Sequence, residues 1–161
     1  RTYTDGGIEY QYDIAARNVS HQSNDQSVEF TLDIAKAYPP EANIETWVRS
    51  VCFNRGQDII LTDRYHLKAV TGDLTFNLLT ACHPETVGPG VLALRETALA
   101  DGRVSGTAQI QYDADLLDVT FEPVPIEDSR LKTVWGDRLT RIVLTVKTPS
   151  TQGVWTVKIT S

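Results

Sequence analysis

The stretch WVRSVCFNRGQDIILTDRYHLKAVTGDLTFNLLTACHP, residues 47–84, decides the fold. From Trp47 to Phe53 every second residue shares one face, which is the two-residue period of a half-buried strand. The turn residues 54–56 follow, and then come apolar runs at 58–62 and 74–81. The stretch therefore predicts strand, tight turn, strand, loop and strand in succession, which is typical of an accessory β domain.

Alternating apolar patterns continue on both sides of this stretch. Further strands are predicted at 28–34, 91–95, 107–113, 117–122, 139–147 and 154–160. Each such strand has one apolar face, and stacking two sheets is what gives every face a partner. The sequence predicts an all-β fold, an antiparallel two-sheet β-sandwich of about 9–12 strands, with residues 1–161 as a single domain.

Two local features refine the expected topology. The turn-rich segment PSTQG separates the last two predicted strands, 139–147 and 154–160, and indicates a hairpin between them. Pro123 and Pro125 follow the strand predicted at 117–122, and proline cannot donate a ladder hydrogen bond. We therefore expect that segment at a sheet edge or in a crossover.

The composition is that of an ordinary soluble globular domain. The net charge is -6, from 15 Lys plus Arg and 21 Asp plus Glu, which argues against nonspecific binding to nucleic acid or an anionic membrane. No apolar run approaches the roughly 20 residues of a membrane span. Because the chain contains no methionine, we expect a mature protein or an excised fragment.

The two cysteines, Cys52 and Cys82, lack the close or repeated spacing of a metal motif or a disulfide framework. Each lies within an apolar strand pattern, which favours a free buried thiol that packs as a small hydrophobe. Their redox state, and with it the compartment, stays open at this level.

Residues that could carry chemistry are sparse. No Gly-x-Ser-x-Gly elbow or phosphate-binding glycine loop is present in the sequence. A metal-dependent enzyme built on His66, His83 and Asp63 is one hypothesis, but strands and loops do not give these residues the helical spacing that makes a metal site specific. We predict no catalytic residue, no bound metal and no cofactor.

Several cationic side chains gather on the central strands, where two interpretations compete. Arg49, Arg55 and Arg64, with His66 and Lys68, are suited to contact an anionic sugar. Alternatively, the first and third of these arginines tether neighbouring carboxylates, for which Asp58 and Asp63 are at hand. The tether is the simpler interpretation.

The three tryptophans differ in their surroundings. Trp155 alternates with apolar residues and is predicted in the core, whereas Trp135 adjoins Gly136 in an irregular stretch and is the better surface candidate. Trp47 fits either role. The candidates for contact with carbohydrate or with another domain are Arg64, Tyr65, His66 and Trp135.

The segment AYPPEANIETWVRSVCFNRGQDIILTDRY, residues 37–65, resembles the C-terminal β region of heparinase II/III-like polysaccharide lyases. The shared pattern is an aromatic-x-Arg strand, an Arg-Gly turn and a strand ending in Asp-x-aromatic. LLTACHP at 78–84, LKTVWGDRLTRIVLTV at 131–146 and GVWTVKIT at 153–160 fit the same region. The likeness covers about residues 28–160 and includes no catalytic motif of the family.

The resemblance implies that the parent protein has an N-terminal α/α toroid, which in this family supplies most catalytic and substrate-binding residues. The reaction is β-elimination, in which a base removes the proton next to a uronate carboxylate and an acid, often a tyrosine, assists the leaving oxygen. The family's His-x-His-x-Asp-like metal segment has no counterpart in this sequence. No catalytic role is therefore carried over to this chain, although Tyr65 and His66 are chemically capable.

The leading hypothesis is a non-catalytic C-terminal β-sandwich, part of a larger heparinase II/III-like protein whose catalytic toroid it supports. The resemblance implies a periplasmic or extracellular location and a parent that acts on uronate-containing glycans. The alternative is an autonomous carbohydrate-binding module for acidic polysaccharide, with Trp135, Tyr65 or the arginine strand as its binding surface.

Overall fold

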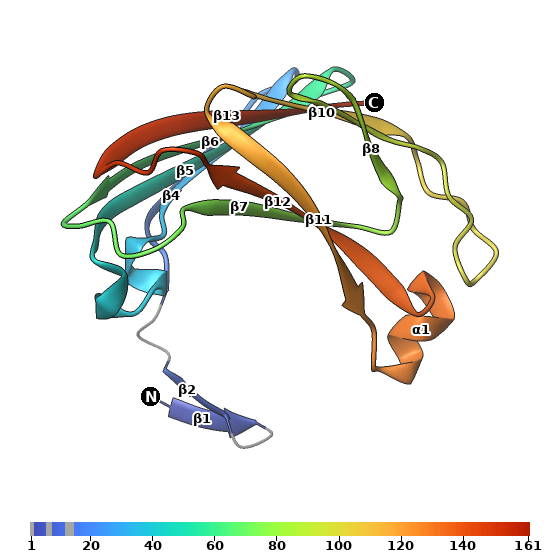
Figure 1. Cartoon of the computed structure of the whole chain (residues 1–161), viewed down its shortest axis with the longest axis horizontal. Helices are drawn as coiled ribbons and strands as arrows, with labels where there is room; N and C mark the ends of the chain where they lie inside the picture. Colours follow the sequence, from blue (N-terminus) through green and yellow to red (C-terminus); the bar gives the residue numbers. More distant parts are fainter. Residues whose placement is uncertain (1, 6–7, 12–14) are drawn as a thin grey trace. The chain divides into compact units, whose positions relative to one another are not determined.

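The chain folds into antiparallel β-structure, as seen in a computed structural model that describes residues 2–5, 8–11 and 15–161 (Figure 1). Within these ranges, eight strands form one sheet, in the spatial order β3 (Arg17–Ser23), β4 (Ser27–Asp33), β5 (Ile44–Asn54), β6 (Asp58–Leu67), β13 (Gln152–Thr160), β10 (Ala108–Tyr112), β9 (Val91–Leu94) and β8 (Pro84–Gly88). Three more form a second sheet, in the order β11 (Leu117–Pro125), β12 (Arg138–Val146) and β7 (Thr75–Thr80). Strand β1 (Thr2–Asp5) pairs with β2 (Ile8–Gln11). The predicted all-β, two-sheet fold is confirmed.

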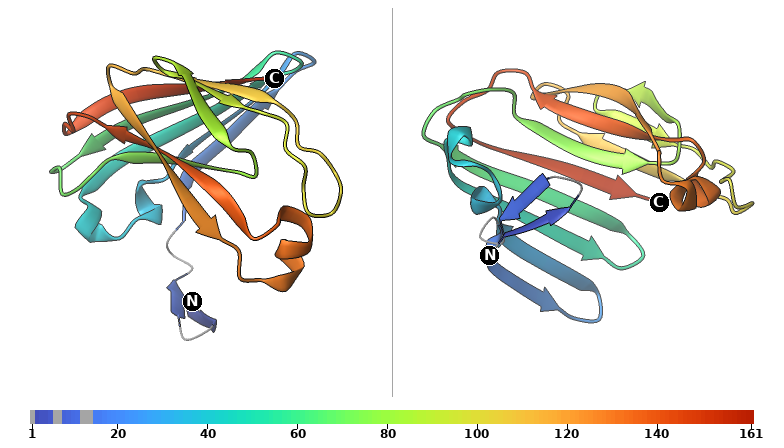
Figure 2. Two further views of the ribbon diagram at one scale, coloured as in Figure 1. Left: turned by 45° about the vertical axis from the view of Figure 1, so that its right-hand side comes forward. Right: turned by 90° about the horizontal axis from the view of Figure 1, so that it is seen from below.

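The strands are distributed over two compact units. The first contains residues up to Gly56 together with 60–71 and 150–156, and the second contains 57–59, 72–149 and 157–161. Within the first unit β3, β4 and β5 lie side by side at one edge of the larger sheet (Figure 2). The assignment of the whole chain to a single domain stays a prediction.

The first unit is built on an aromatic core. Trp47, Tyr65 and Trp155 are each at most 5% exposed and come from three different strands. On β6 the buried residues alternate with exposed ones, because successive side chains of a strand point to opposite faces. This alternation extends beyond the predicted end of the strand, to Leu67.

The second unit has an aliphatic core to which both sheets contribute. Its fully buried side chains are Leu92, Ile110, Leu117, Ile142, Leu144 and Val157. On β12 the inward residues are those at even positions, 142, 144 and 146. This is the interior of a sandwich, in which each sheet turns its apolar face inward.

The predicted hairpin between the last two strands is wrong. Strand β12 pairs with β11 and β7, whereas β13 lies in the other sheet between β6 and β10. The turn-rich segment 147–151 therefore links the two sheets. A short turn-rich loop suits either connection, and the inward apolar residues of both strands are buried here by stacking across the sandwich.

The prolines behave as expected. Pro123 and Pro125 lie in β11, which continues through them and forms an edge of the three-stranded sheet. An edge strand has a neighbour on one side only, so a proline whose nitrogen faces the open side removes no hydrogen bond from the sheet. The edge prediction is confirmed.

The described ranges also hold three short helical segments that were not expected from the sequence: η1 (Ala35–Ala37), η2 (Pro40–Ala42) and α1 (Ser129–Trp135). Asp128 caps α1 by accepting from the backbone N–H groups of Arg130 and Leu131. Gly136 ends it at a φ of 84°. With seven residues, α1 is too short to show a helical period, although the Asp and Gly at its ends are recognisable signals.

Both cysteines are free, as their sequence context favoured; Cys82 is buried as expected, whereas Cys52 is only half-buried. Among the described residues, no helix combines the length and the hydropathy needed to cross a membrane.

Candidate functional site

The candidate residues Arg64, Tyr65 and His66 are consecutive on β6, so they point alternately to its two faces. Arg64 and His66 are exposed, whereas Tyr65 is only 4% exposed. With Thr46 and residues 152–154 they line a pocket of about 330 Å³. The ring of Tyr65 is not available as a stacking platform, and the outward surface consists of the two polar side chains.

Tyr65 belongs to the aromatic core of the first unit. Its ring centroid lies 5.3 Å from that of Trp47 and 5.3 Å from that of Trp155. The two indoles meet edge to face at 5.5 Å, and Tyr38 stacks on Trp47 at 6.1 Å. Such contacts stabilise a core beyond the area they bury. Trp47 and Trp155 are therefore core anchors.

Gly153 makes room for the ring of Tyr65. A Cβ at residue 153 would lie 2.6 Å from the Tyr65 hydroxyl oxygen and 2.8 Å from two of its ring carbons. These distances are shorter than any normal contact, so only glycine fits beneath the ring. An aromatic side chain that covers a glycine also fixes the register of neighbouring strands.

Arg49 and Asp63 form an ion pair in which the carboxylate is buried and the guanidinium is partly exposed. Nε and Nη2 of Arg49 donate to the two carboxylate oxygens of Asp63, each at 2.7 Å. Asp63 is 1% exposed. The side-chain hydrogen bonds with Asp63 raise the pKa of Arg49, a shift that burial opposes and the charge of Asp63 reinforces. The predicted tether is confirmed for this pair, which has a structural role.

The tether expected between Arg64 and a neighbouring carboxylate does not form. Asp58 lies 3.0 Å from Nζ of Lys158, and in the described part of the chain no carboxylate pairs with Arg64. His66 places Nδ1 2.7 Å from a carboxylate oxygen of Glu45. The outward face of β6 therefore offers one guanidinium without a carboxylate partner and one imidazole already held by a carboxylate.

The metal hypothesis finds no support in the described residues. No group of three or more His, Cys, Asp or Glu side chains among them is placed to hold a metal ion. Both oxygens of Asp63 are taken by Arg49, and His66 is taken by Glu45. His83 lies in the second unit.

Trp135 is a surface residue, as its surroundings predicted. It is the last residue of α1 and is 41% exposed. Among the described residues no ring contact is found for it, so its indole takes no part in an aromatic cluster. Trp135 and the Arg64–His66 segment belong to different units and are two separate candidates.

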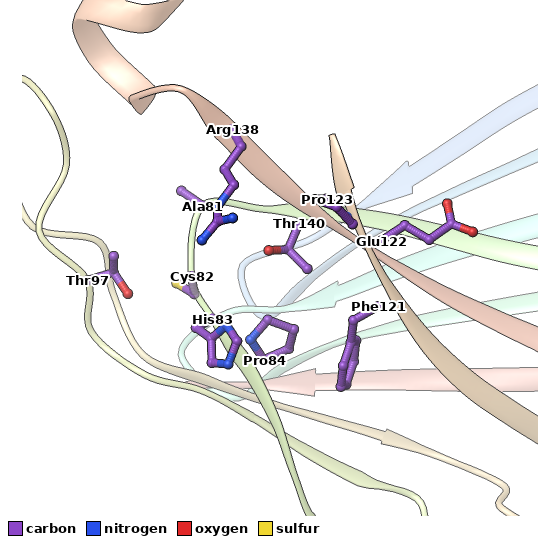
Figure 3. A pocket seen from close by; sticks show the side chains of 10 residues that line it. All are labelled: Ala81, Cys82, His83, Pro84, Thr97, Phe121, Glu122, Pro123, Arg138 and Thr140. Carbon is purple, nitrogen blue, oxygen red and sulfur yellow. The ribbon is translucent and has the colours of Figure 1, made fainter. Parts of the chain in front are cut away.

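A pocket in the second unit brings His83, which the sequence offered only as a metal-site candidate, together with residues that sequence reasoning did not connect to a site (Figure 3). It has a volume of about 430 Å³. Its walls are residues 81–84, Thr97, residues 121–123 of β11, and Arg138 and Thr140 of β12. The missed signal is on β12, where a guanidinium and a hydroxyl occupy the same even positions as the core residues.

The fold of this chain is similar to that of solved polysaccharide lyase structures. The heparan sulfate lyase HepC from Pedobacter heparinus superimposes with a TM-score of 0.65 and 16% identity, over 90% of this chain and 21% of the lyase chain. A mutant of that lyase gives a TM-score of 0.64 at the same identity and coverage. No family model matches the sequence, and no curated protein sequence matches it. The chain thus spans about a fifth of the length of the lyase structures it matches, and at this identity the likeness shows the fold.

Proposed function

We propose that this chain is a non-catalytic β-sandwich domain of a larger heparinase II/III-like polysaccharide lyase, which acts on uronate-containing glycans by β-elimination. The domain packs against a catalytic α/α toroid of the same protein and supports its cleft. The observation that carries the proposal is the fold match, which accounts for 90% of this chain and 21% of a heparan sulfate lyase.

The state of the chemically capable side chains supports a non-catalytic role. β-Elimination needs a base, an acid and a group that neutralises the carboxylate of the substrate, all within reach of one sugar. Tyr65 is buried against two indoles, Asp63 is held by Arg49, and His66 is paired with Glu45. Tyr65 and Asp63 are therefore engaged in the core of the first unit, and His66 is engaged in a surface contact.

An exposed apolar face supports a place within a larger protein. Phe30 on β4 and Phe53 on β5 are 49% and 41% exposed. The strand register pairs Phe30 with Val51 and Val28 with Phe53, so all four share one face of the sheet, and Trp47 lies further along that face. Contiguous exposed apolar surface of this kind marks an interaction site. In the proposed lyase the remainder of the protein covers it.

The proposed function also implies where the parent protein is located. A polysaccharide lyase meets its polymer outside the cytoplasm, so we place the parent protein in the periplasm or the extracellular space. We also place residues 1–161 in one domain, at the C-terminal side of the toroid.

The experiment is a lyase assay on the isolated chain. β-Elimination creates a double bond conjugated to the uronate carboxylate, and the product is followed by its ultraviolet absorbance. Heparan sulfate, heparin and alginate are the substrates, and an active polysaccharide lyase run in parallel is the control. The expected result is no product above the protein-free rate, and turnover that scales with chain concentration would refute the non-catalytic role.

The exposed indole of Trp135 favours a second candidate, an autonomous carbohydrate-binding module. Aromatic side chains with an open face stack on sugar rings. Titration with acidic oligosaccharides separates the candidates: saturable binding that Trp135→Ala abolishes supports the module.

A further inference from the structure

The pocket of Figure 3 lies where the inward face of the three-stranded sheet changes from apolar to polar. The register pairs Phe121 with Ile142 and Pro123 with Thr140, so these four residues share the inward face. Ile142 is fully buried, whereas Phe121 is 40% exposed. The sandwich interior therefore opens at this end into a cavity with one aromatic wall.

Three polar groups face this cavity without a partner among the described residues. They are the guanidinium of Arg138, the imidazole of His83 and the hydroxyl of Thr140, and Figure 3 shows them around one open space. In the described part of the chain, no side-chain hydrogen bond or ion pair engages any of them. An arginine and a histidine that converge with a hydroxyl are donors suited to an oxyanion such as carboxylate or sulfate.

The one acidic side chain among the pocket residues does not oppose such a ligand. Glu122 alternates with Phe121 and so points to the other face of β11. There its carboxylate is 3.3 Å from Nη1 of Arg141, and Figure 3 shows it directed away from His83 and Arg138. The cavity keeps a net positive lining.

The pocket wall opposite β12 is held in place by Ser105. Its hydroxyl lies 3.2 Å from the sulfur of Cys82 and accepts from the backbone N–H of Thr97 at 3.0 Å. The hydroxyl of Thr97 donates to the carbonyl of Arg95, which leaves its oxygen free to accept from a ligand. These contacts tie residue 82, which precedes His83, to the segment that carries Thr97 and Ser105.

We propose that this pocket binds an acidic sugar residue of a polysaccharide. Arg138, His83 and Thr140 bind its carboxylate or sulfate, the ring of Phe121 covers its apolar face, and Thr97 accepts from a hydroxyl. The volume of about 430 Å³ is that of a small-ligand site. The preference for an oxyanion follows from the lining residues, whereas a polysaccharide as its source rests on the proposed function; absent binding would leave the result of the lyase assay unaffected.

The test is calorimetric titration of the chain with a hyaluronan oligosaccharide, which carries carboxylates and no sulfate. A sulfated form and a carboxyl-reduced form of the same oligosaccharide are titrated in parallel. Saturable binding of either acidic form, and none of the neutral form, is the expected result. The stronger of the two identifies the preferred anion. Binding of neither acidic form, or equal binding of the neutral form, overturns the proposal.

Variants locate the site. Arg138→Ala and Phe121→Ala are each expected to weaken binding at least about tenfold, as loss of one charged hydrogen bond or one stacked ring does. The matched control is Arg141→Ala, which removes a guanidinium from the opposite face of the same strand and should leave affinity unchanged. A control variant that weakens binding as much as Arg138→Ala overturns the assignment. Circular dichroism and the unfolding midpoint show that each variant is folded.

Discussion

The fit between Gly153 and Tyr65 allows a sharp test of how the first unit is packed. Gly153→Ala adds one methyl group in contact with three atoms of the Tyr65 side chain, the nearest at 2.6 Å. The ring is 4% exposed and packs against two indoles, each with its centroid 5.3 Å away, so a movement of the ring disturbs a filled core. The backbone at this glycine is not in the left-handed region, so the effect of the substitution is steric.

The expected cost follows from two opposing terms. Forcing a methyl group into a filled core typically costs about 1–3 kcal/mol. Replacing a strand glycine by alanine returns about 0.5–1 kcal/mol through the lower entropy of the unfolded chain. We therefore expect Gly153→Ala to lower the free energy of unfolding by about 1–2 kcal/mol.

Urea unfolding followed by tryptophan fluorescence measures this change, since Trp47 and Trp155 lie in the perturbed cluster. The matched control is Gly88→Ala, at a strand glycine where an added methyl group would meet no atom within 4 Å and where φ lies outside the left-handed region. The second background is Tyr65→Leu, which removes the clashing ring atoms. There Gly153→Ala should cost nothing or stabilise. An unchanged cost in that background, or none in the wild-type background, would refute the packing described above.

Three further perturbations test other parts of the structure. Asp63→Asn leaves the guanidinium of Arg49 without its counter-charge and should lower the free energy of unfolding by about 3 kcal/mol, measured by urea unfolding; no loss would contradict a structural role. Hydrogen bonds from the side chain and backbone of Arg130 lower the pKa of Asp128, so its stabilisation of α1 is present above about pH 4 and is lost as pH falls through that lowered pKa. Protection of the α1 amides, measured as the intrinsic exchange rate at each pH divided by the observed rate, should fall there, and Asp128→Ala should remove this pH dependence. Phe30→Ser should reduce binding of an apolar fluorescent dye to the isolated chain with little change in stability; unchanged dye binding would show that this face is not the exposed apolar surface.

Short-range patterns in the sequence were sufficient for most of the strands and for much of the core, but β3 and β8, whose residues lack a clear apolar alternation, were missed. Alternation placed Trp155 in the core, and proline chemistry placed Pro123 at a sheet edge. The Arg49–Asp63 pair could be predicted from the sequence, because a tight turn makes their two strands antiparallel neighbours. Each of these inferences depends on residues within one strand or one hairpin.

Features that depend on segments far apart in the sequence could not be predicted in this way. Whether segment 147–151 closes a hairpin or joins two sheets depends on which strands flank β12, and alternation says nothing about neighbours. The pocket of Figure 3 combines residues 81–84, Thr97 and two strand ends, which only the folded sandwich brings together. Helix α1 was missed because it is shorter than two full turns.

The central claim is that this chain is one domain of a much larger lyase, and the mass of the native polypeptide tests it most directly. An antibody raised against residues 15–161 detects that polypeptide in a periplasmic or secreted fraction of the source cells, and mass spectrometry of the captured protein gives its length. Because the chain matches 21% of a lyase chain, the account predicts a polypeptide several times heavier than 17.9 kDa, with peptides from an α/α toroid. A native polypeptide of 17.9 kDa that carries these residues alone would contradict it.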